Sequence, residues 1–72
     1  MEDLTALINM VSNWESGDSK ASKLCFMAEN KKDNLMAIFD AFVDCYDVSI
    51  NRLDGVGGMF CEVTLTRLRP NL

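Results

Sequence analysis

The feature that most constrains the fold is a long alternating segment near the end of the chain. From Met59 to Arg69, apolar and polar residues alternate with a period of two, which is the pattern of a β-strand. Residues 48–51 alternate in the same way and predict a strand over residues 48–53. The glycine-rich stretch 54–58 between the two strands is typical of a hairpin loop. Pro70 is expected to end the second strand, because proline has no N–H to donate to a sheet.

Three further elements are predicted upstream of this hairpin. Residues 3–15 carry apolar side chains at helical spacing, and residues 31–46 do the same, with Asn30 as the expected N-cap. Between them, residues 23–28 form a short apolar run that fits a strand buried on both faces. The apolar stripe of the second helix consists of Leu35, Ile38, Phe39, Phe42, Val43 and Tyr46.

The element order α-β-α-β-β limits the possible topologies of this 72-residue chain, which we expect to form one domain. The first strand, the second helix and the second strand form a crossover connection. The last strand, residues 59–69, is predicted to be about twice as long as its hairpin partner, so it is best placed at the centre of the sheet, paired on both sides. We therefore predict an α+β fold with a three-stranded, mainly antiparallel sheet in the order 1-3-2, a split β-α-β arrangement with both helices on one face.

Alternation in the last strand divides its side chains between two faces. Cys61, Val63 and Leu65 share the face that we expect to pack against the helices. The other face stays open, and contiguous apolar exposure on a small protein commonly marks an interaction site. The predicted partner-binding residues of this open face are Phe60, Thr64, Thr66 and Leu68. The alternative is that these are scattered surface hydrophobic residues, which are normal.

A row of aspartates on the second helix is the rival candidate surface. Its members are Asp33, Asp40, Asp44 and Asp47, of which the last three repeat at i, i+4 and i+7. Such a row could bind a basic groove on a partner, including one that otherwise holds nucleic acid. An ordinary solvated helix face is the alternative interpretation.

Several kinds of chemistry are poorly supported by the residue types present. The chain has no histidine, the commonest general base. Its three cysteines, Cys25, Cys45 and Cys61, lack paired spacing, so we expect buried thiols rather than a disulfide framework or a zinc site. We therefore predict no catalytic residue, no cofactor and no metal. A thiol-dependent activity is the remaining enzymatic hypothesis.

Charge and hydropathy narrow the list of partners. The net charge of −4 opposes the counterion release that drives sequence-independent binding to nucleic acid. No apolar run approaches the roughly 18 residues that a membrane span requires. The first residues are acidic where an export signal is basic, so we expect a cytoplasmic protein.

The closing segment, residues 62–70, resembles the final strand of small phage-encoded inhibitors of bacterial RNA polymerase. The preceding elements do not follow that family's order, and the resemblance implies no site residues here. From the residues themselves we predict a small, non-enzymatic protein-binding module, of the kind that phages and plasmids use to occlude a host protein or nucleoprotein complex. The alternative is a structural homo-oligomer that buries its open sheet face against a second copy.

Overall fold

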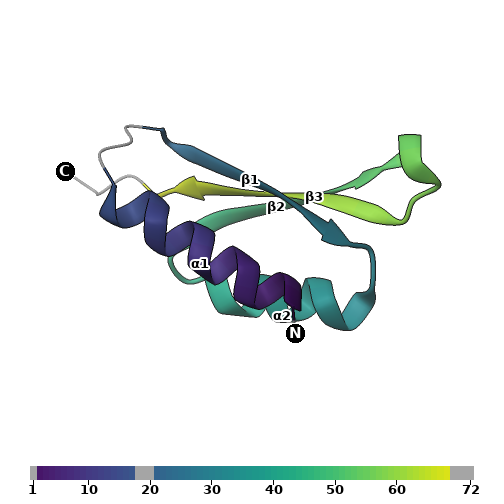
Figure 1. The fold of residues 1–72 in the computed structure, drawn as a ribbon, viewed down its shortest axis with the longest axis horizontal. Coiled ribbons are helices and arrows are strands. Elements are labelled where there is room, and N and C mark those ends of the chain that lie inside the picture. Colours follow the sequence, from purple (N-terminus) through teal and green to yellow (C-terminus); the bar gives the residue numbers. More distant parts are fainter. Residues whose placement is uncertain (1, 18–20, 69–72) are drawn as a thin grey trace.

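The computed structural model describes residues 2–17 and 21–68 and shows two helices over a three-stranded sheet (Figure 1). The elements are α1 (Glu2–Ser16), β1 (Lys23–Glu29), α2 (Lys32–Phe42), β2 (Tyr46–Leu53), the 3-10 turn η1 (Asp54–Val56) and β3 (Phe60–Arg67). The strands are antiparallel in the order β1-β3-β2, and both helices lie on the same face of the sheet. The predicted α+β fold and its strand order are confirmed.

Element boundaries differ from the prediction mainly around α2. This helix ends at Phe42 rather than at residue 46, and a turn leads directly into β2, which starts at Tyr46 rather than at residue 48. The apolar spacing continues through the turn, so periodicity alone could not locate the end of the helix. The predicted N-cap is also wrong, because Lys31 holds that position and the Asn30 side chain donates to the Gly58 carbonyl instead.

The central position of β3 was predicted for the wrong reason. β2 and β3 are both eight residues long, so β3 does not outrun its hairpin partner. Residues 59 and 68 lie just outside β3, and residues 69 and 70, where the strand was expected to end, lie outside the described residues. The helix-facing residues of β3 are the most deeply buried of the three strands, as expected for a central strand.

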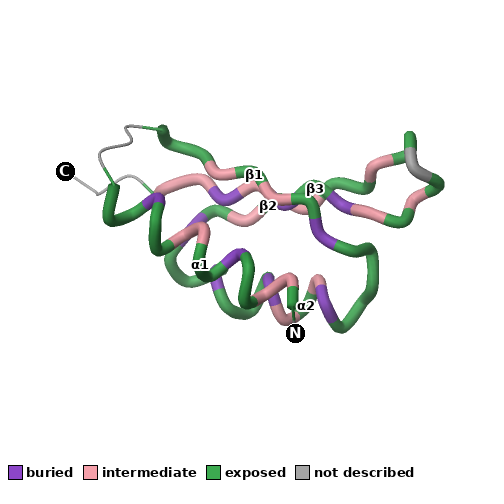
Figure 2. The backbone as a smooth tube through the Cα atoms, in the orientation of Figure 1, coloured by how far each residue is buried: buried purple, intermediate pink, exposed green. Residues whose placement is uncertain are grey.

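The core lies between the sheet and the two helices. Val63 and Leu65 of β3 are completely buried and Cys61 nearly so, which confirms the predicted core face. Leu65 pairs with Leu24 of β1 and Val48 of β2, so one apolar row crosses all three strands. From the helix layer, Leu7 and Ile38 are also completely buried, and Figure 2 shows such positions on the facing sides of the two layers.

One carboxylate joins the starts of both helices to the end of β1. Asp3 Oδ2 of α1 accepts hydrogen bonds of 2.8 Å from the backbone N–H of Glu29 and from the side-chain amide of Asn34 in α2. Asn34 is buried and also donates to the Glu29 carbonyl at 2.9 Å. Helix α1 packs on β1, and α2 contacts both β1 and β2.

The predicted loop 54–58 closes the β2–β3 hairpin at the far end of the molecule (Figure 1). Gly57 and Gly58 adopt positive φ angles of 68° and 73°, which glycine tolerates without steric cost. A Cβ on Gly58 would also collide with the Arg52 guanidinium. Among the described residues, no helix is both long enough and apolar enough to cross a membrane.

Candidate protein-interaction surfaces

The open sheet face contains the first predicted site but is largely polar. Phe60, Thr64 and Thr66 are half-buried on this face, while Leu68 follows the end of β3 and is 55% exposed. The residues beside the two threonines on the outer strands are Lys23, Cys25, Asp47 and Ser49. The structure therefore places the four predicted residues along one strand, without gathering them into an apolar surface.

Apolar side chains on the open face gather only at its hairpin end. Phe60 lies opposite Leu53 of β2, and Met27 of β1 is 59% exposed nearby. A shallow hollow of about 210 Å³ is lined by Cys25, Phe26, Met27, Leu53 and Glu62. This volume is below the roughly 300 Å³ at which small-molecule sites usually begin. The hollow therefore fits a side chain of a partner better than a ligand.

The second predicted site does not form a single row. Asp33 and Asp40 are on α2, Asp44 is in the turn that follows, and Asp47 is on β2. Asp47 pairs with Thr66 and so shares the open sheet face, on the opposite side of the molecule from the helix layer. All four are exposed, and in residues 2–17 and 21–68 none of them forms a salt bridge. The early end of α2 breaks the predicted row.

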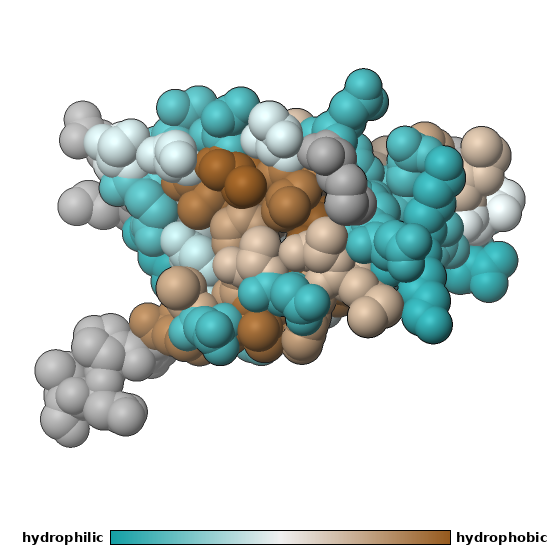
Figure 3. All heavy atoms as spheres, turned by 90° about the horizontal axis from the view of Figure 1, so that it is seen from below, coloured by the Kyte–Doolittle hydropathy of each residue, from teal (hydrophilic) through white to brown (hydrophobic). Residues whose placement is uncertain are grey.

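A surface that the sequence analysis missed lies on the outside of the helix layer. Four large hydrophobic side chains there are between 39% and 52% exposed, and we call them the helix-layer patch: Ile8, Met36, Phe39 and Val43. Figure 3, seen from the helix side, shows a continuous hydrophobic area across both helices. Asp40 is four residues from Met36 and three from Val43, so helical phase places its carboxylate within this patch.

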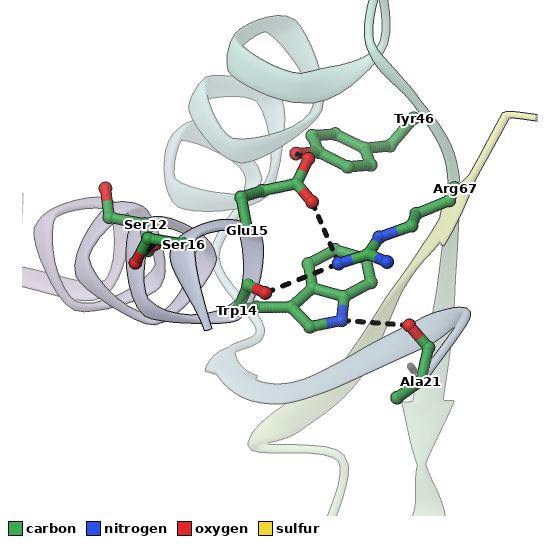
Figure 4. A network of polar contacts seen from close by, with 7 residues as sticks. All are labelled: Ser12, Trp14, Glu15, Ser16, Ala21, Tyr46 and Arg67. Carbon is green, nitrogen blue, oxygen red and sulfur yellow. Dashed lines mark hydrogen bonds and ion pairs between the residues drawn. The ribbon is translucent and has the colours of Figure 1, made fainter. Parts of the chain in front are cut away.

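A polar and aromatic cluster fastens the end of α1 to the sheet (Figure 4). The indole of Trp14 stacks on the Tyr46 ring at 5.6 Å between centroids and donates its N–H to the Ala21 carbonyl at 3.1 Å. The Arg67 guanidinium lies 4.5 Å from the centre of the Trp14 ring. The Glu15 carboxylate accepts hydrogen bonds from both Arg67, at 2.9 Å, and the Tyr46 hydroxyl, at 2.6 Å. These contacts hold the end of α1 against the sheet.

Burial and the Glu15 carboxylate together raise the pKa of Tyr46 to about 12 from its ordinary value of 10. Desolvation is the larger cause, and the hydrogen bond and negative charge of Glu15 add to it, while Arg67 opposes them. The raised pKa means that the folded state favours the protonated phenol. This contribution to stability is complete below pH 10 and is lost as the pH rises through 12.

We therefore expect the stability of the fold to fall by about 1.4 kcal/mol per pH unit between pH 10 and 12 from this residue alone. Tyr46 is the only tyrosine in the chain, so absorbance at 295 nm follows it without interference from another phenol. The folded chain should show one tyrosinate transition near pH 12, and the urea-unfolded chain one near pH 10. Coincident transitions in the two states would contradict the burial of the Tyr46 hydroxyl and its contact with Glu15.

The cysteines are less buried than predicted. Cys61 is buried as expected, but Cys25 and Cys45 are exposed, so the expectation of three buried thiols is wrong for two of them. The Cys25 Sγ lies 3.8 Å from the Thr64 hydroxyl, at the outer limit of a weak hydrogen bond. Among the described residues, no group of three or more histidine, cysteine or acidic side chains is placed to hold a metal ion.

Comparison with known proteins returned no match to any protein-family model, any curated protein or any solved structure.

Proposed function

We propose that this chain is a non-enzymatic protein-binding module whose contact surface is the helix-layer patch. One observation supports this proposal more than any other: four large hydrophobic side chains are exposed together on one face of a 72-residue chain. Surfaces of this kind are costly to leave in water and typically become the buried centre of a protein interface. The open sheet face is less suited to the same role, since polar residues occupy most of its positions.

Charge near the patch indicates the chemistry of the partner. Asp40 is exposed within the patch and Asp44 is exposed in the turn after α2, and neither has a salt-bridge partner in the described part of the chain. We infer a partner that offers an apolar groove with lysine or arginine at its rim. Covering such a groove occludes it, which is the action of an inhibitor. Three free thiols suit a reducing compartment, and we place this activity in the cytoplasm.

Two matched methionine substitutions test which face is used. Met36 in the helix-layer patch is 52% exposed and Met27 on the open sheet face is 59% exposed, so Gln at either position should leave the fold intact. Met36→Gln is expected to weaken binding by about tenfold or more, because it removes apolar contact area from the centre of the interface. Met27→Gln should bind like the unmodified chain. A partner captured from native-cell lysate by the unmodified chain, then titrated by calorimetry, provides the measurement.

Circular dichroism of both variants checks that each remains folded. If Met27→Gln loses binding while Met36→Gln still binds, the binding site lies on the open sheet face around Phe60. The charge component has a separate readout, since binding to a basic rim must weaken as salt is added. Affinity that is independent of ionic strength would exclude a role for Asp40 and Asp44.

A further inference from the structure

The backbone groups at the two edges of the sheet are not equally protected. The N–H of Arg67 donates to the Ser22 carbonyl, and the N–H of Asn30 donates to the Met59 carbonyl. The backbone N–H and C=O groups of the odd-numbered residues of β3 therefore point toward β1. The backbone N–H and C=O groups of the even-numbered residues of β3 point toward β2. They form hydrogen bonds with the odd-numbered residues of β2, which are their partners in the register. The even-numbered residues of β2 consequently direct their N–H and C=O groups away from the sheet: Tyr46, Val48, Ile50 and Arg52.

The edge at β1 is partly closed by the chain itself. The outward N–H of Glu29 is bound by Asp3, and the Glu29 carbonyl accepts from the Lys31 N–H and from Asn34. Hydrogen bonds of this kind at a sheet edge limit unwanted strand pairing.

The edge at β2 has no comparable protection. Within residues 2–17 and 21–68, the outward N–H groups of Val48, Ile50 and Arg52 have no hydrogen-bond partner. The side chains of Val48 and Ile50 point toward the helix layer, and both are half-buried. An unprotected edge with apolar side chains beneath it is a template for another strand.

We propose that β2 pairs with β2 of a second copy of this chain, antiparallel about a two-fold axis at Ser49, to form a continuous six-stranded sheet. In this register Val48 lies opposite Ile50 of the second copy, so apolar side chains meet on the helix side of the sheet. The self-pairing also keeps the acidic side chains of β2 apart. Asp47 lies opposite the Asn51 amide of the second copy, on the open face of the sheet. A parallel pairing in register would instead bring two Asp47 carboxylates together.

Two lysine substitutions with the same net charge test the register. Ser49 and Asn51 are both exposed on the open face of β2. Ser49→Lys places two lysines directly opposite each other across the axis, and we expect dimerisation to weaken by about fivefold or more. Asn51→Lys places each lysine opposite an Asp47 carboxylate, so dimerisation should be preserved or strengthened. Sedimentation equilibrium up to millimolar concentration measures both, and circular dichroism confirms that both variants fold.

Cross-linking provides an independent measurement in a chain with Cys25 and Cys45 changed to serine. Residues 49 of the two copies form a non-hydrogen-bonded pair with Cα atoms about 4.5 Å apart, within the range of a disulfide. Ser49→Cys should therefore give a covalent dimer on mild oxidation. Asn51→Cys should not, because the two thiols lie four strand positions apart, about 13 Å.

A chain that stays monomeric at millimolar concentration overturns the proposal. Equal dimer affinities of the two lysine variants, or equal yields of covalent dimer from the two cysteine variants, overturn it as well. These outcomes are distinct from a failure of the proposed function. Met36→Gln should leave dimerisation unchanged, and Ser49→Lys should leave the helix-layer patch able to bind its partner. A dimer of this kind would present two copies of that patch.

Discussion

Replacing Leu65 with alanine is expected to leave the chain largely unfolded at room temperature. Leu65 is completely buried at the middle of the central strand, between Leu24 and Val48. Truncating such a leucine costs about 2–5 kcal/mol through lost transfer energy and the cavity that remains. A core of this size rarely supplies more than about 3–5 kcal/mol in total. The substitution therefore removes most of the available stability, which urea titration followed by circular dichroism will measure.

Leu68→Ala is the matched control, with the same change of side chain three residues further along. Leu68 is 55% exposed and lies just beyond the end of β3, so its truncation should change the unfolding free energy by less than about 0.5 kcal/mol. Equal effects of the two substitutions would show that the core is not centred on β3.

The second large effect is expected at Trp14. Its side chain is 6% exposed, stacks on Tyr46 and lies under the Arg67 guanidinium. Trp14→Ala should cost about 3–5 kcal/mol, because it opens a large cavity and removes the surface on which both neighbours rest. The ion pair between Glu15 and Arg67 would then lose its apolar shielding. Thermal unfolding followed by far-ultraviolet circular dichroism measures the loss.

Trp14→Phe separates the ring from its N–H. A phenyl ring preserves most of the stacking on Tyr46 but cannot donate to the Ala21 carbonyl, so the expected cost is nearer 1–2 kcal/mol. If phenylalanine proves as damaging as alanine, the indole hydrogen bond rather than the ring packing is the main contribution of this residue.

The core face of β3 was accessible from the sequence because alternation reports directly on burial, whereas the strand order was predicted from a difference in strand length that the structure does not show. Cys61, Val63 and Leu65 form an uninterrupted apolar set with period two, and all three are buried. The end of α2 was not accessible, because the tertiary structure decides it. Val43 continues the helical spacing of the preceding residues, and Tyr46 then pairs with Arg67 as the first residue of β2. A periodic stripe shows which residues are apolar, not where the backbone changes direction.

Periodicity alone also could not predict which candidate surfaces would be exposed. The predicted helical stripe included Phe39 and Val43, which are 42% and 39% exposed, because an apolar stripe can be wider than the surface that covers it. The sequence could not show which flank of each helix stays uncovered, since that depends on how the two helices pack on the sheet and on each other. Conversely, Asp47 was assigned to the helix face, and the early start of β2 carries it to the opposite side of the molecule.

The stacking of Trp14 on Tyr46 has a practical consequence, because the chain has one tryptophan and one tyrosine. Light absorbed by the phenol in the folded chain passes efficiently to an indole 5.6 Å away, so tyrosine emission should be quenched. When α1 separates from β2, the two rings move apart and tyrosine emission should appear. Energy transfer from Tyr46 to Trp14 is thus an intrinsic probe of the structure, and a single emission spectrum can report whether α1 is packed against β2.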